Sequence, residues 1–156
     1  MKLSANFTLD ELIKSQVAER KNINNNPTPD VIENLKELCI NVLQPIRSHF
    51  DKPVLISSGY RSAQICIEIG SSINSQHTLG MASDIEIWSI SNKDLFDYIR
   101  NNLEFDQLIL EFWKGEEQPN SGWVHVSYNK NDNRRQCLIA SRNEDGKIVY
   151  KPYLGY

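Results

Sequence analysis

The chain has 156 residues, a length that accommodates one hydrophobic core, and we expect residues 1–156 to form a single, monomeric domain. Hydrophobic residues make up 40% and charged residues 24% of the chain, as in ordinary soluble globular proteins. The formal net charge of −3 provides no basic field, so neither nucleic acid nor an anionic membrane surface is an expected partner.

The cysteines and the N-terminus narrow the class of protein further. Three cysteines, an odd number without CxxC spacing, argue against a disulfide framework and a cysteine zinc cluster, so we interpret Cys39, Cys66 and Cys137 as buried thiols. Residues 1–16 contain no apolar segment of signal-peptide length, and no segment approaches the roughly 18 apolar residues of a membrane span. We therefore expect a protein made in the cytoplasm without a signal peptide, with no insertion into membranes.

The first element is predicted to be a helix over residues 9–20. Thr8 followed three residues later by Glu11 is the capping-box pattern at a helix N-terminus. Apolar residues then recur at helical spacing, at Leu9, Leu12, Ile13 and Val17.

A second, longer helix follows a turn-rich break at residues 22–29. Thr28 and Pro29 supply an N-cap and a proline at the first helical position. The apolar residues that follow at helical spacing make this helix the main candidate for the core; they are Val31, Ile32, Leu35, Leu38, Val42, Leu43 and Ile46. Pro45 predicts a kink or an early end near Gln44.

The rest of the chain is predicted to be mostly strands. A buried strand in residues 53–62 breaks at Ser58–Gly59, and a helix over 63–70 ends with Gly70 as its C′ residue. The remaining segments are a strand at 81–88, a helix at 91–102, strands at 105–113 and 123–129, and a hairpin over 137–153 that turns at Asp145–Gly146. This order predicts an α+β domain, with N-terminal helices packed on a mainly antiparallel sheet.

Two histidines and one aspartate form a candidate metal site. His77 lies seven residues before Asp84, at the mouth of strand 81–88, and His125 lies within strand 123–129. Alternation places Asp84 and His125 each on the face of its strand opposite to apolar neighbours. If the two strands are neighbours, two nitrogens and one oxygen converge and leave a fourth position for water, as in catalytic zinc sites. The spacing alone fits equally well with hydrogen-bonded core groups or a solvated edge.

A longer motif contains these residues. The string SxHxxGxAxD occupies residues 75–84, WVH occupies 123–125, and SGYRS precedes them at 58–62. This combination resembles the zinc D-alanyl-D-alanine carboxypeptidase family, which includes bacterial cell-wall carboxypeptidases, D-Ala-D-Ala dipeptidases and phage endolysin peptidases, and which shares its fold with the hedgehog signalling domain. The similarity covers most of residues 6–128.

The resemblance implies roles for particular residues. It makes His77, Asp84 and His125 the ligands of one zinc ion per chain. Arg61 falls where the family has an arginine facing the substrate, and a guanidinium can pair with a peptide carboxylate or a developing oxyanion. Ser75 is expected to orient either His77 or the substrate.

The general base is the point at which this sequence departs from much of the family. Several members have an acidic residue three positions before the second histidine ligand, where this chain has Gly122. We expect Glu111, at the end of an apolar strand, to replace it as the base that moves the proton in amide hydrolysis. Glu116 and Glu117 are the alternatives. Trp123 is expected to line the substrate groove.

The functional hypothesis is therefore a zinc metallopeptidase that hydrolyses peptide bonds in peptidoglycan stem peptides, as a carboxypeptidase or an endolysin-type endopeptidase. A non-catalytic cell-wall binding module stabilised by zinc is the alternative, and a structural role in a phage particle is a third possibility. The sequence leaves a phage or bacterial role open; a phage lysis protein would reach the cell wall after release through a membrane pore.

Overall fold

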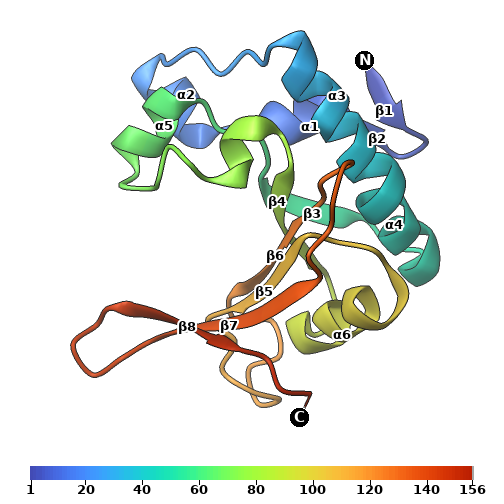
Figure 1. The fold of residues 1–156 in the computed structure, drawn as a ribbon, viewed down its shortest axis with the longest axis vertical. Coiled ribbons are helices and arrows are strands. Elements are labelled where there is room, and N and C mark those ends of the chain that lie inside the picture. Colours follow the sequence, from blue (N-terminus) through green and yellow to red (C-terminus); the bar gives the residue numbers. More distant parts are fainter. Residues whose placement is uncertain (156) are drawn as a thin grey trace.

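The computed structural model describes residues 1–155 and contains a six-stranded sheet, a small two-stranded sheet and several short helices (Figure 1). The small sheet pairs β1 (Lys2–Ser4) with β2 (Phe7–Thr8). In spatial order, the strands of the main sheet are β3 (Val54–Ser58), β4 (Ala82–Ile87), β6 (Trp123–Ser127), β5 (Gln107–Glu111), β7 (Gln136–Arg142) and β8 (Ile148–Pro152). Only the β5–β7 pair is parallel within the described residues, so the expected α+β class with a mainly antiparallel sheet is confirmed.

Most of the helices lie in the N-terminal half. They are α1 (Leu9–Ile13), α2 (Gln16–Lys21), α3 (Pro29–Leu38), the π-helical turn η1 (Cys39–Leu43), α4 (Gln44–Phe50), α5 (Ala63–Glu68), the 3-10 turn η2 (Gln76–Leu79) and α6 (Asn92–Asn102). Helices α3, α4 and α6 lie on one side of the main sheet, whereas α2 and α5 lie together beyond its opposite side (Figure 1).

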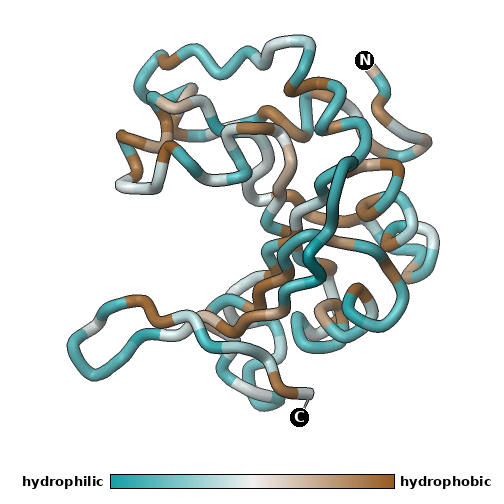
Figure 2. Tube along the Cα trace, in the orientation of Figure 1, coloured by the Kyte–Doolittle hydropathy of each residue, from teal (hydrophilic) through white to brown (hydrophobic). Residues whose placement is uncertain are grey.

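The hydrophobic core lies between the main sheet and helices α3, α4 and α6. Ile85 and Ile87 of β4 and Val124 and Val126 of β6 are fully buried and pack in one cluster with Phe96 of α6. Apolar colour accordingly concentrates along the central strands and the inner turns of these helices in Figure 2. Side chains alternate along a strand, so the residues between these apolar ones point to the opposite face of the sheet. That face can carry polar groups.

The first predicted helix is wrong in one respect, because the chain forms two helices there. Lys14 adopts an extended conformation, and Ser15 begins α2 as its N-cap, with its Oγ accepting a hydrogen bond from Ala18 N–H at 3.2 Å. The Thr8 cap of α1 is confirmed. A second N-cap residue inside the apolar pattern offers the backbone an alternative to continuous helix, and the pattern by itself does not show this.

The second predicted helix does not end near Gln44. The chain remains helical from Pro29 to Phe50 and widens into the π-helical turn η1 just before Pro45. Gln44 N–H donates to the carbonyl of Cys39, a step of five residues. Proline has no N–H to satisfy, so the wider turn accommodates it while the helix continues.

Three further expectations need correction. Strand β3 is half-exposed rather than buried, because it forms one edge of the sheet, and Leu55 is 61% exposed. Strands β1 and β2 are too short to produce a periodic pattern, and the sequence did not predict them. Cys39 and Cys66 are buried as expected, but Cys137 is only half-buried on β7.

The predicted end of α5 and the predicted turn of the C-terminal hairpin are confirmed. Gly70 follows α5 with φ of 73°, the left-handed conformation typical of a C′ glycine. The β7–β8 hairpin turns at Asp145–Gly146, where Gly146 has φ of 78°. Within residues 1–155, no helix is both long enough and apolar enough to cross a lipid bilayer.

Candidate metal centre

A short 3-10 turn, rather than the strand itself, positions His77. Ser75 caps this turn, and its Oγ accepts a hydrogen bond from His77 N–H at 3.2 Å. Gly80 ends the turn with φ of 72°, and a Cβ on Gly80 would lie 2.7 Å from the carbonyl oxygen of Val31. The serine and glycine of the SxHxxG string therefore shape the turn that directs the buried imidazole toward the sheet.

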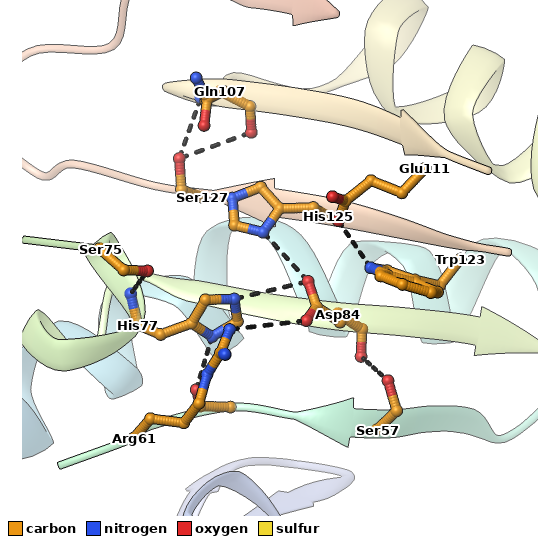
Figure 3. Close-up of polar contacts among 11 residues, drawn as sticks. Ser57, Arg61, Ser75, His77, Asp84, Gln107, Glu111, Trp123, His125 and Ser127 are labelled. Carbon is orange, nitrogen blue, oxygen red and sulfur yellow. Dashed lines mark hydrogen bonds and ion pairs between the residues drawn. The ribbon is translucent and has the colours of Figure 1, made fainter. Parts of the chain in front are cut away.

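Asp84 and His125 come from neighbouring strands. They are direct partners in the antiparallel β4–β6 pair, on the face that the large helices leave free. Asp84 Oδ1 lies 3.0 Å from His125 Nδ1 and 3.5 Å from His77 Nε2 (Figure 3). All three residues are buried, and one ligand atom from each lies within 4.8 Å of the others. The structure thus brings together the three residues that the sequence analysis named as metal ligands.

The protonation of His77 fits a cation in this space. Its Nδ1 lies 2.7 Å from the carbonyl oxygen of Gly59, which can only accept, so Nδ1 carries the hydrogen and neutral Nε2 presents a lone pair to Asp84. Burial lowers the pKa of His77, although Asp84 opposes this shift, so a second proton on the ring is disfavoured. Two facing lone-pair groups repel each other unless a cation lies between them.

The chemistry of the donor set suits zinc. Two imidazoles and one carboxylate are the ligands of open, catalytic zinc sites. Ligand atoms on a tetrahedral zinc ion are about 3.4 Å apart, given bonds of about 2.1 Å. The separations of 3.0 and 3.5 Å around Asp84 Oδ1 are close to that value.

The charge on Asp84 is held by its surroundings. Burial disfavours the charged carboxylate, but polar interactions led by the hydrogen bond with His125 outweigh burial and keep the pKa of Asp84 well below its usual range. Arg61 adds a positive charge, with Nη2 3.8 Å from Asp84 Oδ2. Asp84 therefore remains an anion and a competent metal ligand over the whole physiological range of pH.

Arg61 is held at the edge of the cluster. Its backbone N–H donates to the carbonyl of His77 at 3.1 Å, and its side chain is 16% exposed. The buried Nε has no hydrogen-bond partner among the described residues. A buried guanidinium N–H without an acceptor carries an energetic cost. Arg61 also lines the pocket around the cluster.

Glu111 lies in the same pocket, at the end of β5. It faces Trp123 in the β5–β6 pair, and Trp123 Nε1 donates a hydrogen bond to Glu111 Oε2 at 2.6 Å (Figure 3). Burial, followed by the negative charge of Asp84, raises the pKa of Glu111 above its ordinary value. A carboxylate with a raised pKa and one oxygen already fixed is suited to accept and return a proton.

The structure also explains Gly122. This residue has φ of 66°, and a Cβ built on it would lie 1.8 Å from the backbone oxygen of Glu111. No side chain fits there, so no acidic residue can act from this position. Glu116 and Glu117 are exposed in the loop after β5 and do not line the pocket. Of the three candidate bases, only Glu111 lies beside the His–Asp–His cluster.

The pocket around the cluster has a volume of about 880 Å³ and extends well beyond the residues that the sequence analysis named. Ser75, Trp123 and Arg61 line it, as expected. Residues that were not expected also line it, among them Gln107, Phe112, Arg142, Ile148 and Tyr150. Alternation of side chains along the predicted hairpin could have shown which residues share a face with Arg142. However, no sequence signal showed that β7 pairs in parallel with β5 and carries the hairpin to the pocket.

Comparison with known proteins agrees with the geometry. The family model described as Peptidase M15 matches residues 5–127, which include all three cluster residues, Arg61 and Glu111. No match was found among curated proteins. The matched family consists of zinc-dependent peptidases, in agreement with the donor set of the cluster. The chain therefore belongs to the peptidase M15 family.

Proposed function

We propose that this peptidase hydrolyses peptide bonds in the stem peptides of bacterial peptidoglycan, with one zinc ion bound by His77, Asp84 and His125. Membership of the family supports a peptidase, and at family level it supports action on peptidoglycan. The observation that carries the proposal is the convergence of two imidazoles and one carboxylate in a pocket that also contains Glu111 and Arg61.

Zinc, when bound, lowers the pKa of a coordinated water and polarises the scissile carbonyl. The protein's own groups supply the rest of the chemistry. Trp123 holds Glu111 Oε2, which leaves Oε1 to take a proton from the attacking water and to deliver it to the leaving amine. Arg61 pairs with negative charge on the substrate, either the oxyanion that develops at the carbonyl or a nearby carboxylate.

The first test combines metal analysis with an activity assay. We expect elemental analysis of the purified protein to give one zinc per chain. We expect purified peptidoglycan to release peptides or amino acids, chelation to stop the release, and added zinc to restore it. His77→Ala should lose both the metal and the activity. Activity that persists in metal-free protein would refute the mechanism.

Two outcomes of the same test point to other functions. Zinc bound at one ion per chain, with no hydrolysis of peptidoglycan from several bacterial wall types, would favour a binding module on the same fold. Identification of the released products decides between the two modes of hydrolysis. A carboxypeptidase releases single C-terminal amino acids, whereas an endopeptidase separates larger fragments.

A further inference from the structure

The C-terminal hairpin adds a wall to the pocket beyond the matched residues 5–127. Parallel pairing places Ala140 of β7 directly beside Glu111 of β5, and antiparallel pairing places Tyr150 of β8 beside Ala140. Arg142 lies two residues beyond Ala140 and therefore shares its face of the sheet. Glu111, Arg142 and Tyr150 all line the pocket, so this wall stands next to the proposed catalytic groups.

Phe112 adopts an uncommon backbone conformation at the base of this wall. Its φ is 58°, a value that bulky residues rarely adopt, and strained residues of this kind are enriched at functional sites. Its N–H donates to the carbonyl of Ala140 at 2.9 Å, and its ring centroid lies 5.4 Å from that of Trp123. The strained residue thus sets an aromatic ring between the Trp123 side of the pocket and the hairpin.

Arg142 packs on that ring. Its guanidinium carbon lies 5.2 Å from the centroid of Phe112, and its Nη1 donates to the carbonyl of Gly146 at 3.0 Å. These two contacts restrict the guanidinium at the pocket lining. Only one of its five N–H donors has a hydrogen-bond acceptor among the described residues, so a ligand carboxylate could accept from the others.

The charges of the pocket suit an acidic ligand. Among the described residues that line it, Arg61 and Arg142 balance the carboxylates of Asp84 and Glu111. A bound zinc ion would make the pocket cationic overall, although the chain has a net charge of −3. The local field therefore favours an anionic peptide, whereas the surface as a whole does not.

We propose that Phe112 and Arg142 form a carboxylate-binding subsite at the hairpin end of the pocket, which recognises an acidic residue of the peptide substrate. The proposal rests on the proposed function, and it adds the chemical class of residue that this end of the site accepts. Arg61 and Arg142 lie on opposite sides of the His–Asp–His cluster, because β4, β6 and β5 separate the segments that carry them.

The strand spacing indicates which carboxylate Arg142 reaches. Strand β7 lies two positions from β6, so its side chains are about 10 Å from the column of His125. An extended peptide needs about three residues to cover that distance. In a stem pentapeptide cut between its two D-alanines, the free α-carboxylate of the D-glutamate belongs to the third residue before the scissile bond and fits this distance. The C-terminal carboxylate of a single released residue does not.

Peptide binding to zinc-loaded Glu111→Gln protein, measured by calorimetry, tests the subsite without hydrolysis. The probes are a synthetic stem pentapeptide, the same peptide amidated at its D-glutamate α-carboxylate, and the same peptide amidated at its C-terminus. In this background we expect Arg142→Gln to weaken binding of the unmodified peptide about tenfold. The control is Lys151→Gln, which removes the same charge from the exposed residue that follows Tyr150 on the opposite face of β8, and we expect it to change binding by less than about twofold.

The amidated peptides identify the carboxylate. We expect the effect of Arg142→Gln to disappear with the D-glutamate amide and to persist with the C-terminal amide. If the effect disappears only with the C-terminal amide, Arg142 contacts the terminal carboxylate and not the internal one, and the spacing argument is overturned. Equal weakening for all three peptides, equal weakening by Lys151→Gln, or no weakening at all would overturn the subsite.

A second variant tests the aromatic platform. Phe112→Gly relieves the left-handed backbone but removes the ring, so we expect normal folding and a several-fold weaker affinity for the two peptides that keep the D-glutamate carboxylate, but not for the D-glutamate amide. The subsite alone would be rejected if the wild-type protein hydrolyses peptidoglycan but the acidic and amidated peptides bind with the same affinity. Protein that binds the acidic peptide through Arg142 but hydrolyses nothing would reject the proposed function alone.

Discussion

At the scale of single residues, hydrogen bonds from neighbouring groups fix the orientation of the side chains in and beside the cluster. The Gly59 carbonyl selects the tautomer of His77, and Trp123 fixes one oxygen of Glu111. Each contact leaves the opposite atom of the same side chain available, Nε2 of His77 for metal and Oε1 of Glu111 for a proton. Substitutions that keep shape but remove one of these functions should therefore separate metal binding from catalysis.

Glu111→Gln should separate them most cleanly. The amide cannot accept and return a proton, so we expect kcat to fall by about 10²–10⁴-fold while zinc content stays at that of the wild type. Steady-state assays on a soluble stem peptide, with elemental analysis of the same samples, provide the measurement. Glu117→Gln, in the exposed loop, is the matched control and should retain wild-type rates. A rate unchanged by Glu111→Gln would assign the base elsewhere.

Trp123→Phe should shift the pH dependence of the reaction. The hydrogen bond from Trp123 lowers the pKa of Glu111 and so opposes the rise caused by burial and by Asp84. Without this bond the pKa of Glu111 rises further, and the acidic limb of kcat/KM moves to higher pH. The measurement is the full pH profile of both proteins, and a limb at lower pH in the variant would contradict the assignment.

At the scale of elements, the β5–β6 connection positions Glu111, the proposed base. Gly122 precedes β6 with its backbone against the carbonyl of Glu111, and this close approach permits the Glu111–Trp123 pairing. The same contact excludes an acidic residue from position 122. The absence of an acidic residue at position 122 and the placement of Glu111 beside the cluster are thus two consequences of one backbone arrangement.

Gly122→Ala should lower the free energy of unfolding by more than backbone strain alone would. A left-handed conformation costs a non-glycine residue about 1–2 kcal/mol, which is the loss expected for Gly70→Ala, where no atom lies within 4 Å of the added Cβ. At Gly122 the added Cβ also overlaps Glu111, so we expect a loss of about 3 kcal/mol or more. The free energy of unfolding in urea measures both, and equal losses would show that the loop moves freely.

At the scale of the whole molecule, the buried ionisable cluster couples stability to pH and metal. In metal-free protein, the lowered pKa of His77 makes its protonation unfavourable to folding, so stability falls as pH drops below about 6.5. The lowered pKa of Asp84 contributes stability above about pH 4, which is lost on further acidification.

Urea unfolding of metal-free protein between pH 7.5 and 3 should therefore show stability decreasing in two ranges. We expect His77→Gln to flatten the range between pH 7 and 5 and to leave the decline below pH 4, because the variant has no imidazole to protonate at that position. Stability that rises on acidification from pH 7 to 5 would contradict the direction of the His77 shift.

Zinc should stabilise the folded chain by an amount that increases with the ratio of its concentration to its Kd. A ligand at 1,000 times its Kd adds about 4 kcal/mol when it binds only the native state. We expect zinc to raise Tm in thermal unfolding, chelator to reverse the change, and His125→Ala to abolish it. Lys151→Gln, which leaves the cluster intact, should retain the full zinc-dependent shift.

The sequence by itself determined the local features of this protein. The SxHxxGxAxD and WVH strings picked out the three residues that the structure brings together in the His–Asp–His cluster, the Thr8 and Thr28 caps identified two helix starts, and Asp145–Gly146 identified the hairpin. Each of these depends on residues close together in the chain, where spacing and side-chain chemistry act directly. The pattern failed where a local alternative competed with it, at the Ser15 cap. At Pro45, where a kink or an early end near Gln44 was expected, the helix continues through a π-helical turn at Cys39–Leu43.

Only the tertiary structure decided how distant segments meet. The parallel β5–β7 pairing brings the hairpin to the pocket, and the close approach of Gly122 to Glu111 leaves Glu111 as the carboxylate beside the cluster. Neither has a local signature, because strand order and backbone approach are set by packing of the whole sheet against its helices. The residues of the His–Asp–His cluster can therefore be identified from a short sequence motif, whereas the shape of the pocket around them emerges only from the assembled fold.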